Sequence, residues 1–192
     1  MKNRIVTISR EFGSGGHIIG KKVAENLEIP CYDSELIEKI AQESGFAPSF
    51  IQEAGEYASD ESMIPAFSAR ALGPTAQDLL WRVQQKIIIG LAEKHPCVIV
   101  GRCADYILRE KAECLRVFIH ANMEYRAKRI VETYGEQPET PEQRIRDKDK
   151  RRAAYYCFYT EMKWGYAQNY HICLESGVIG IDACVNGIQR LY

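Results

Sequence analysis

The sequence lacks both an excess of either charge and any long apolar run. Its 25 Lys and Arg residues nearly balance 26 Asp and Glu residues, which leaves a formal net charge of −1. Such a chain gives no reason to expect a nucleic acid or an anionic membrane surface as its partner. No apolar segment approaches the length that spans a bilayer, and the charged start at residues 1–4 leaves no room for a signal peptide. We therefore expect a cytoplasmic protein in which any anion site is local.

The sequence also lacks the cysteine and histidine spacings that hold metals. Its seven cysteines include no C-x-x-C pair, and an odd number of cysteines in a chain without a signal peptide indicates free thiols. Most of them stand in apolar surroundings, which favours a packing role over metal binding or catalysis. The four histidines are too dispersed to predict a zinc site.

The composition is that of one folded domain. Hydrophobic residues make up 46% of the chain and charged residues 27%, which is ordinary for a globular protein and argues against disorder. A chain of 192 residues can hold one sizeable core. We found no internal repeat or low-complexity segment, and we expect residues 1–192 to form a single domain.

A glycine-rich turn follows the first apolar segment. Residues 5–8 are β-branched and mostly apolar, which predicts a buried strand. Gly13, Gly15 and Gly16 then allow a sharp turn, and apolar residues recur at helical spacing over residues 18–27. A strand, a glycine turn and a helix N-terminus together form the geometry of a phosphate site. The alternative is a tight structural turn that binds no ligand.

The turn departs from the phosphate-loop pattern G-x-x-x-x-G-K-[ST] at three of its four defining positions. If Gly15 is the second glycine of the pattern, the first glycine falls on Arg10. The lysine then falls on Gly16, and the metal-binding hydroxyl falls on His17. The dinucleotide pattern G-x-G-x-x-G fits no better, because it requires a glycine at Ile18.

Apolar strands and helical patterns alternate along the rest of the chain. Further strands are predicted at residues 28–32, 97–100, 115–121 and 170–174. Helices are predicted after residue 34, from residue 75, over 123–134, over the charged segment from 144, and over 180–191. In the helix over 123–134, Arg126 is expected to point outward. Five strands that alternate with helices indicate an α/β fold with a parallel sheet covered on both faces.

Polar residues follow two of the predicted strands. Asp33 and Ser34 come after the second strand, and Arg102 comes after the third strand and Gly101. Open α/β sheets bind ligands at the carboxyl ends of their strands, and a guanidinium can fork onto a phosphate or carboxylate. The alternatives are helix capping by Asp33 or Ser34, and a structural ion pair of Arg102 with Asp105 or another acid.

The densest charge lies in the predicted helix that holds residues 144–152. Within it, Asp149 and Arg152 are three residues apart and share a face. Charge runs of this kind are usually solvated faces. This one passes into the aromatic segment 155–159, so we expect one side of the helix to dock on the rest of the protein.

Together these residues resemble the cytidylate-kinase-like family of P-loop proteins over nearly the whole chain. The matching segments are residues 8–16, 32–37, 100–108, 126–130, 149–156, 164–165 and Tyr170. The resemblance implies a three-layer, P-loop NTPase-like α/β fold with about five parallel strands and a helical lid. It also implies a single nucleoside-monophosphate-kinase-like domain over residues 1–192, with an acceptor-side insertion at about 45–74 and the lid at about 135–165.

The resemblance implies ATP-dependent phosphoryl transfer to a nucleoside monophosphate, with cytidylate as the first guess. ATP and Mg²⁺ would be the cofactors, and no metal ligand is assigned. The donor phosphates would bind Gly13, Ser14, Gly15, Gly16 and His17. The acceptor would bind Asp33, Ser34, Arg102 and Asp149. Charge stabilisation and positioning dominate such catalysis, and the arginines that would supply them are Arg10, Arg151 and Arg152.

One departure from characterised cytidylate kinases concerns the reaction directly. Those enzymes keep the loop lysine and the hydroxyl after it, whereas this chain has Gly16 and His17. The missing cation would have to come from Arg10 or from the lid arginines. The alternative function is a nucleotide-binding or sensing protein of the same fold that has lost kinase activity. In either case the implied partner is a small-molecule nucleotide, and no oligomeric state is indicated.

Overall fold

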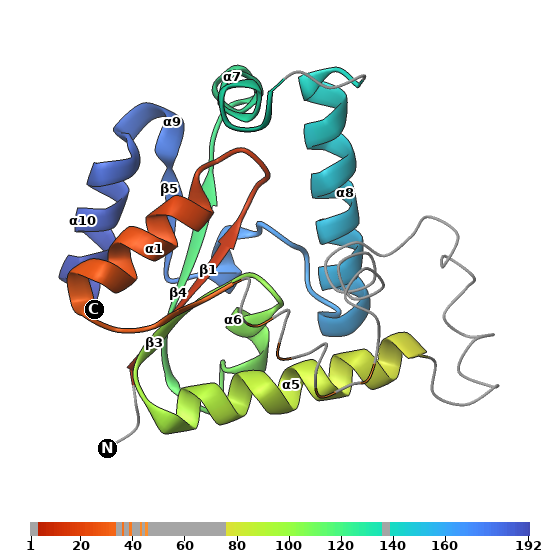
Figure 1. Ribbon diagram of the computed structural model, residues 1–192, viewed down its shortest axis with the longest axis vertical. Helices are drawn as coiled ribbons and strands as arrows, with labels where there is room; N and C mark the ends of the chain where they lie inside the picture. The colour runs from red at the N-terminus through yellow and green to blue at the C-terminus, as the bar shows by residue number, and fades with distance from the viewer. Residues whose placement is uncertain are drawn as a thin grey trace.

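The computed structural model describes residues 4–33, 36, 39, 43, 45, 76–135 and 139–192. Five strands form one parallel sheet in the order β2-β3-β1-β4-β5. Strands β1, β3, β4 and β5 are labelled in Figure 1. The strands are β1 (Arg4–Arg10), β2 (Cys31–Tyr32), β3 (Cys97–Val100), β4 (Glu113–His120) and β5 (Ile172–Glu175). The predicted α/β fold with a five-stranded parallel sheet is therefore confirmed.

The central strand is β1, between β3 and β4. Ile8 pairs with Val100 of β3 on one side and with Val117 of β4 on the other. Residues 5–9 of β1 are all buried. A strand in the middle of a sheet with helices on both faces has no solvent-facing side, which explains its run of apolar residues.

Helices cover both faces of the sheet. On one face lie α1 (Gly16–Leu27) and α10 (Ile181–Leu191), and on the other lie α5 (Ala76–Lys94) and α6 (Ala104–Ile107). The remaining elements are α7 (Met123–Tyr134), α8 (Pro141–Thr160), the 3₁₀ turn Ala167–Asn169 and α9 (Ser176–Ile179). In Figure 1, α8 stands beside the sheet, and α7 lies near the glycine turn. Both stand at the end of the sheet where β1 finishes.

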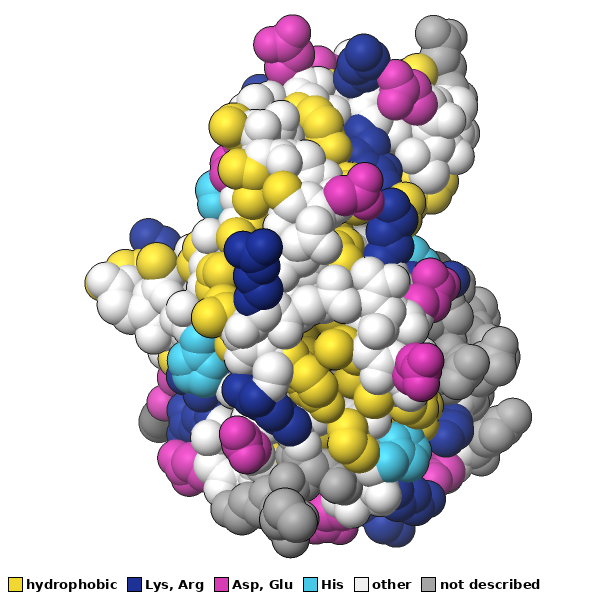
Figure 2. All heavy atoms as spheres, turned by 90° about the vertical axis from the view of Figure 1, so that its left-hand side faces the viewer, with side chains coloured by type: hydrophobic (Ala, Val, Ile, Leu, Met, Phe, Trp, Pro, Cys, Tyr) yellow, Lys and Arg dark blue, Asp and Glu magenta, His cyan; other side chains and the backbone are white. Residues whose placement is uncertain are grey.

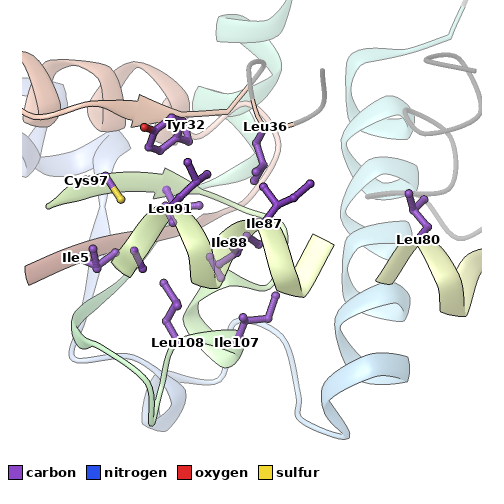
Figure 3. Packing of buried hydrophobic residues seen from close by; sticks show 13 residues of the cluster. Ile5, Tyr32, Leu36, Leu80, Ile87, Ile88, Leu91, Cys97, Ile107 and Leu108 are labelled. Atoms are coloured by element: carbon purple, nitrogen blue, oxygen red, sulfur yellow. The ribbon is translucent and has the colours of Figure 1, made fainter. Parts of the chain in front are cut away.

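The core on the α5 face joins the sheet to two helices (Figure 3). Ile5 of β1 and Cys97 of β3 pack with Ile88 and Leu91 of α5 and with Leu108 just after α6. Burial of each aliphatic side chain contributes about 1.5–3 kcal/mol. Burial also raises the pKa of the Cys97 thiol to about 12, so this cysteine packs as a small apolar residue.

Several element boundaries agree with those predicted. The strand at 97–100 and the helix at 123–134 have the predicted bounds. Helix α8 covers the whole charged segment 144–152 and continues through the aromatic segment 155–159. The short helices α6 and α9 were not predicted. The helix predicted after residue 34, Ser34 itself and the irregular region 45–74 lie outside the described residues, apart from isolated positions.

The face formed by α1, α9 and α10 carries charges of both signs. Figure 2 shows basic and acidic side chains spread between small hydrophobic patches there. Exposed Val178 and Ile179 of α9 and Leu191 of α10 are among the large hydrophobic residues at the surface. Within the described part of the chain, none of the helices combines the length and the hydropathy required to cross a bilayer.

Candidate functional site

The turn between β1 and α1 is held in shape by close packing. Gly13 and Gly15 have φ angles of 82° and 83°, a conformation that side chains with a Cβ rarely adopt. A Cβ on Gly13 would lie 2.9 Å from the Cγ2 atom of Ile130, and one on Gly15 would lie 2.5 Å from the Cδ1 atom of Ile181. Both glycines are therefore required by backbone conformation and by the approach of neighbouring helices.

The turn delivers backbone N–H groups at the start of α1. The Ile19 N–H donates to the Gly15 carbonyl at 3.0 Å, which begins the helical hydrogen-bond pattern. The N–H groups of residues 16–18 precede that bond and have no acceptor within the helix. No acidic side chain occupies the first turn of α1. This helix N-terminus is therefore open to an anion, which the helix dipole favours.

Ser14 stabilises the turn through its side chain. The residue is fully buried, and its Oγ lies 2.9 Å from the Glu11 carbonyl oxygen and 3.2 Å from that of Ile119. The Ser176 hydroxyl donates to the Ser14 carbonyl at 2.6 Å. The Ser14 hydroxyl is thus already engaged, so its predicted contact with a phosphate would have to come from the backbone.

Three side chains with ionisable groups meet beside the turn. The Nη2 atom of Arg10 lies 3.9 Å from Oδ1 of Asp33, and Nδ1 of His17 contacts Oδ2 of the same carboxylate. Arg10 and Asp33 are mostly buried, whereas the His17 side chain is partly exposed. The stem of Arg10 runs across Gly16. Residues at the end of β1, the start of α1 and the end of β2 therefore form one cluster.

A pocket beside this cluster is lined by three arginines. Arg10 after β1, Arg102 after β3 and Arg152 of α8 all border it, together with the aromatic residues Tyr155 and Trp164. Its volume is about 30 Å³, far below the roughly 300–1,000 Å³ of pockets that enclose a small molecule. Side chains must therefore move apart before a nucleotide enters. The pocket lies at the carboxyl end of the sheet, as predicted for Arg102.

Two of the three nitrogen atoms of the Arg102 guanidinium are buried without a hydrogen-bond partner among the described residues. The residue is only 5% exposed, and among the residues that the structure describes no acceptor reaches its buried Nε and Nη1 atoms. Its φ angle of 58° is unusual for a residue with a side chain and is held by a hydrogen bond from Gln84 Nε2 to the Arg102 carbonyl at 2.8 Å. A buried, unpaired cation is costly, so this arrangement suits an anionic ligand.

Asp105 does not neutralise Arg102. Its Oδ2 accepts a hydrogen bond from the Tyr156 hydroxyl at 2.7 Å, and its Oδ1 accepts one from the Ser9 hydroxyl at 3.2 Å. Burial raises the pKa of Asp105, and these two hydrogen bonds oppose that rise. In the described part of the chain no ion pair joins Asp105 to Arg102, so the structural pairing considered for Arg102 is absent there.

The predicted lid helix α8 is fastened to the glycine turn. The Phe12 N–H donates to Oδ1 of Asp149 at 2.7 Å, and Nη1 of Arg126 donates to the Phe12 carbonyl at 3.3 Å. One turn further along α8, Nη1 of Arg152 donates to the Arg10 carbonyl at 3.0 Å. These contacts bring Arg152 to the pocket and turn the Asp149 carboxylate toward the loop.

Arg126 is a residue that sequence reasoning misplaced. It was expected to point outward from its helix, but it is buried, and its Nε lies 3.5 Å from Oε2 of Glu11. Burial raises the pKa of Glu11, and the nearby Arg126 charge opposes that rise. The available signal was the position of Arg126 beside inward-facing Ile130 on the same helix, since residues four apart share a face.

The structure brings together some of the predicted site residues. Arg10, Arg102 and Arg152 border one pocket beside the phosphate-loop candidate Gly13–His17, and Asp33 lies next to Arg10. Arg151 is exposed and does not line that pocket. The roles assigned to these residues stay predictions.

Comparison with models of protein families identifies relatives of this site and fold. A model described as the cytidylate kinase-like family matches residues 5–178. The chain belongs to the cytidylate kinase-like family. The matched range includes the glycine turn, Arg102 and helix α8, so the family resemblance inferred from the sequence is confirmed. Membership supports phosphoryl transfer in general without naming the acceptor.

This chain also resembles solved structures over nearly its whole length. An uncharacterized protein from Eubacterium ventriosum is 30% identical, with a TM-score of 0.74 and 98% of each chain covered. Shikimate kinase from Acinetobacter baumannii is 16% identical, with a TM-score of 0.56 and 98% of this chain and 92% of that chain covered. Shikimate kinase from Bacteroides thetaiotaomicron is 15% identical, with a TM-score of 0.58 and 100% of this chain and 98% of that chain covered. The two kinases show the P-loop kinase fold alone. No curated protein matches the chain.

Proposed function

We propose that the protein transfers the γ-phosphoryl group of ATP to a nucleoside monophosphate, with cytidylate as the first acceptor to test. The observation that carries this proposal is Arg102. Its guanidinium is buried without an acidic partner in the described part of the chain, and it borders a pocket beside the glycine turn. A phosphate monoester is a dianion that matches such a site by charge and by forked hydrogen bonding.

The donor side of the proposed reaction is the N-terminus of α1. The N–H groups of residues 16–18 would bind donor phosphates, because they have no helical acceptor and stand at the positive end of the helix dipole. Mg²⁺ would neutralise charge on those phosphates, and it prefers oxygen ligands. Asp33 fits that requirement, since its carboxylate lies beside the turn in contact with His17 and near Arg10.

On the acceptor side, the pocket would supply position and charge. Arg102 would hold the acceptor phosphate, and Arg152 would lie against the phosphoryl group in transfer. Arg152 is already directed there by its hydrogen bond to the Arg10 carbonyl. Phosphoryl transfer needs little covalent chemistry from the protein, so fixed cations around the transferring group are its main requirement.

The proposal is tested by a coupled assay of ADP release. Full-length protein with ATP and Mg²⁺ is screened against nucleoside monophosphates and small phosphorylated and hydroxyl-bearing metabolites, and thermal stabilisation by ATP is measured in parallel. We expect ADP release with at least one monophosphate, most readily CMP. Stabilisation by ATP without turnover of any acceptor would overturn the proposal and support the alternative of a nucleotide-binding or sensing protein.

A further inference from the structure

Arg10 and Gly16 stand in the reverse of the order that the phosphate-loop pattern requires, with the cation first and the glycine second. The pattern has a glycine at the position of Arg10 and a lysine at the position of Gly16. In this chain a cation stands at the first position and a glycine at the second. If the two departures are linked, the side chains at these two positions must compete for the same space.

The structure shows such competition. A Cβ built on Gly16 would lie 2.5 Å from the Cβ and 2.8 Å from the Cγ of Arg10, closer than real Cβ atoms approach other atoms. The next nearest atom, Cβ of Ile119, would be at an ordinary 3.5 Å. Gly16 is also absent from the described residues with positive φ, so its backbone conformation does not itself require glycine. Only the stem of Arg10 makes glycine necessary at this position.

The charge of Arg10 stays at the site from which the lysine is missing. Its side chain is 11% exposed, it borders the same pocket as Arg102 and Arg152, and its Nη2 lies 3.9 Å from Asp33. Its stem crosses the first residue of α1, the helix whose N-terminus would receive the donor phosphates. A guanidinium here can reach a phosphate bound at that helix end.

We propose that Arg10 replaces the loop lysine as the fixed cation for the β- and γ-phosphates of the donor nucleotide, and that Gly16 is the steric condition for this replacement. The inference rests on the proposed function, because it assigns the donor side of the same site. It gives the glycine at position 16 a role within a working site, since a lysine there would collide with Arg10.

The steric part of the proposal, that Arg10 excludes a side chain at position 16, is tested by a double-mutant cycle in which the free energy of unfolding is measured. Gly16→Ala should destabilise the protein, and the loss should largely disappear when the same change is made in Arg10→Gly. The matched control is Gly20→Ala, whose Cβ would lie 2.7 Å from Cγ2 of Val100, so Arg10→Gly should not rescue it. An equal loss from Gly16→Ala with and without the Arg10 side chain would overturn the steric half.

The charge half is tested by nucleotide affinity, measured calorimetrically without turnover. Arg10→Met should weaken binding of ATP and ADP about 10- to 100-fold, the scale of a hydrogen bond to a charged group, and leave AMP nearly unchanged. Arg10→Lys should retain most of the affinity, and Arg10→Gly/Gly16→Lys should bind ATP more tightly than Arg10→Gly. Unchanged ATP affinity in Arg10→Met, or a loss confined to the acceptor monophosphate, would overturn this assignment.

These measurements separate the two proposals. If ATP affinity depends on Arg10 as expected but no acceptor is phosphorylated, the proposed function fails and the exchange stands. If an acceptor is phosphorylated but the affinity for ATP does not depend on Arg10, the proposal for Arg10 is wrong and the proposed function stands.

Discussion

Arg126 on α7 and Asp149 on α8 form a mostly buried ion pair with a distance of 2.5 Å between Nη1 and Oδ2. The same two side chains bind Phe12 from both sides, since Asp149 accepts from its N–H and Arg126 donates to its carbonyl. The pair therefore joins two helices and the glycine turn. It holds Arg152 of α8 in place relative to the N-terminus of α1, where the donor would bind.

Removal of Arg126 should be strongly destabilising. Arg126→Met removes the cation beside the Asp149 carboxylate and the side-chain donor to the Phe12 carbonyl. Breaking one side of a buried pair costs about 3–5 kcal/mol. Chemical unfolding measures the change. The control is Lys128→Met on the same helix, whose exposed pair with Glu132 spans 3.9 Å and is worth about 0.5 kcal/mol. Equal effects of the two substitutions would show that the pair contributes no more than a surface contact.

Arg102→Met should give the opposite result for stability. Arg102 has no acidic partner in the described structure, so an apolar side chain of similar length removes a buried charge without leaving another unpaired. We expect the free energy of unfolding to stay equal or rise, while the KM for the acceptor rises at least about tenfold. Steady-state kinetics and unfolding are measured on the same preparation. Lower stability with an unchanged KM would assign Arg102 to structure.

The buried carboxyl group of Asp105 should make the free energy of unfolding depend on pH. Burial raises its pKa in the folded protein above the ordinary value of 3.8, so the folded state binds the proton more tightly than the unfolded state. The stability from this group is fully present below pH 3.8 and is lost as pH rises through the folded pKa.

Asp105→Asn removes that titration and keeps one acceptor oxygen for Tyr156 or Ser9, while its amide NH2 can donate to the oxygen of the other hydroxyl. The stability of this variant relative to the unsubstituted protein should therefore increase as the pH is raised from about 4. Urea unfolding at several pH values measures the difference between the two proteins. A difference that falls with rising pH would contradict the raised pKa.

The sequence predicted the elements whose pattern is local. The strand at 97–100 lies between Pro96 and Gly101, and the helix at 123–134 shows a regular apolar spacing, so both had the correct bounds. The helices α6 and α9 have four residues each, too few to show a helical period. Arg102 was found as a candidate because it directly follows a buried strand.

The rest of the site depends on distances between separate segments. Arg126 pairs with Asp149, 23 residues away, and only the packing of α7 on α8 shows which partner this arginine has. In the sequence, Gly16 is a missing lysine, whereas in the structure it is also the residue against which Arg10 packs. The partners of Asp105 likewise come from β1 and α8.

The most direct test of the account follows the γ-phosphate itself. Full-length protein is incubated with Mg²⁺, γ-labelled ATP and each nucleoside monophosphate, and labelled products are separated by chromatography. We predict that label appears in the diphosphate of at least one acceptor in a one-to-one ratio with ADP, and that Arg102→Met reduces it at low acceptor concentration. ATP that stabilises the protein while no label reaches any monophosphate would contradict the account.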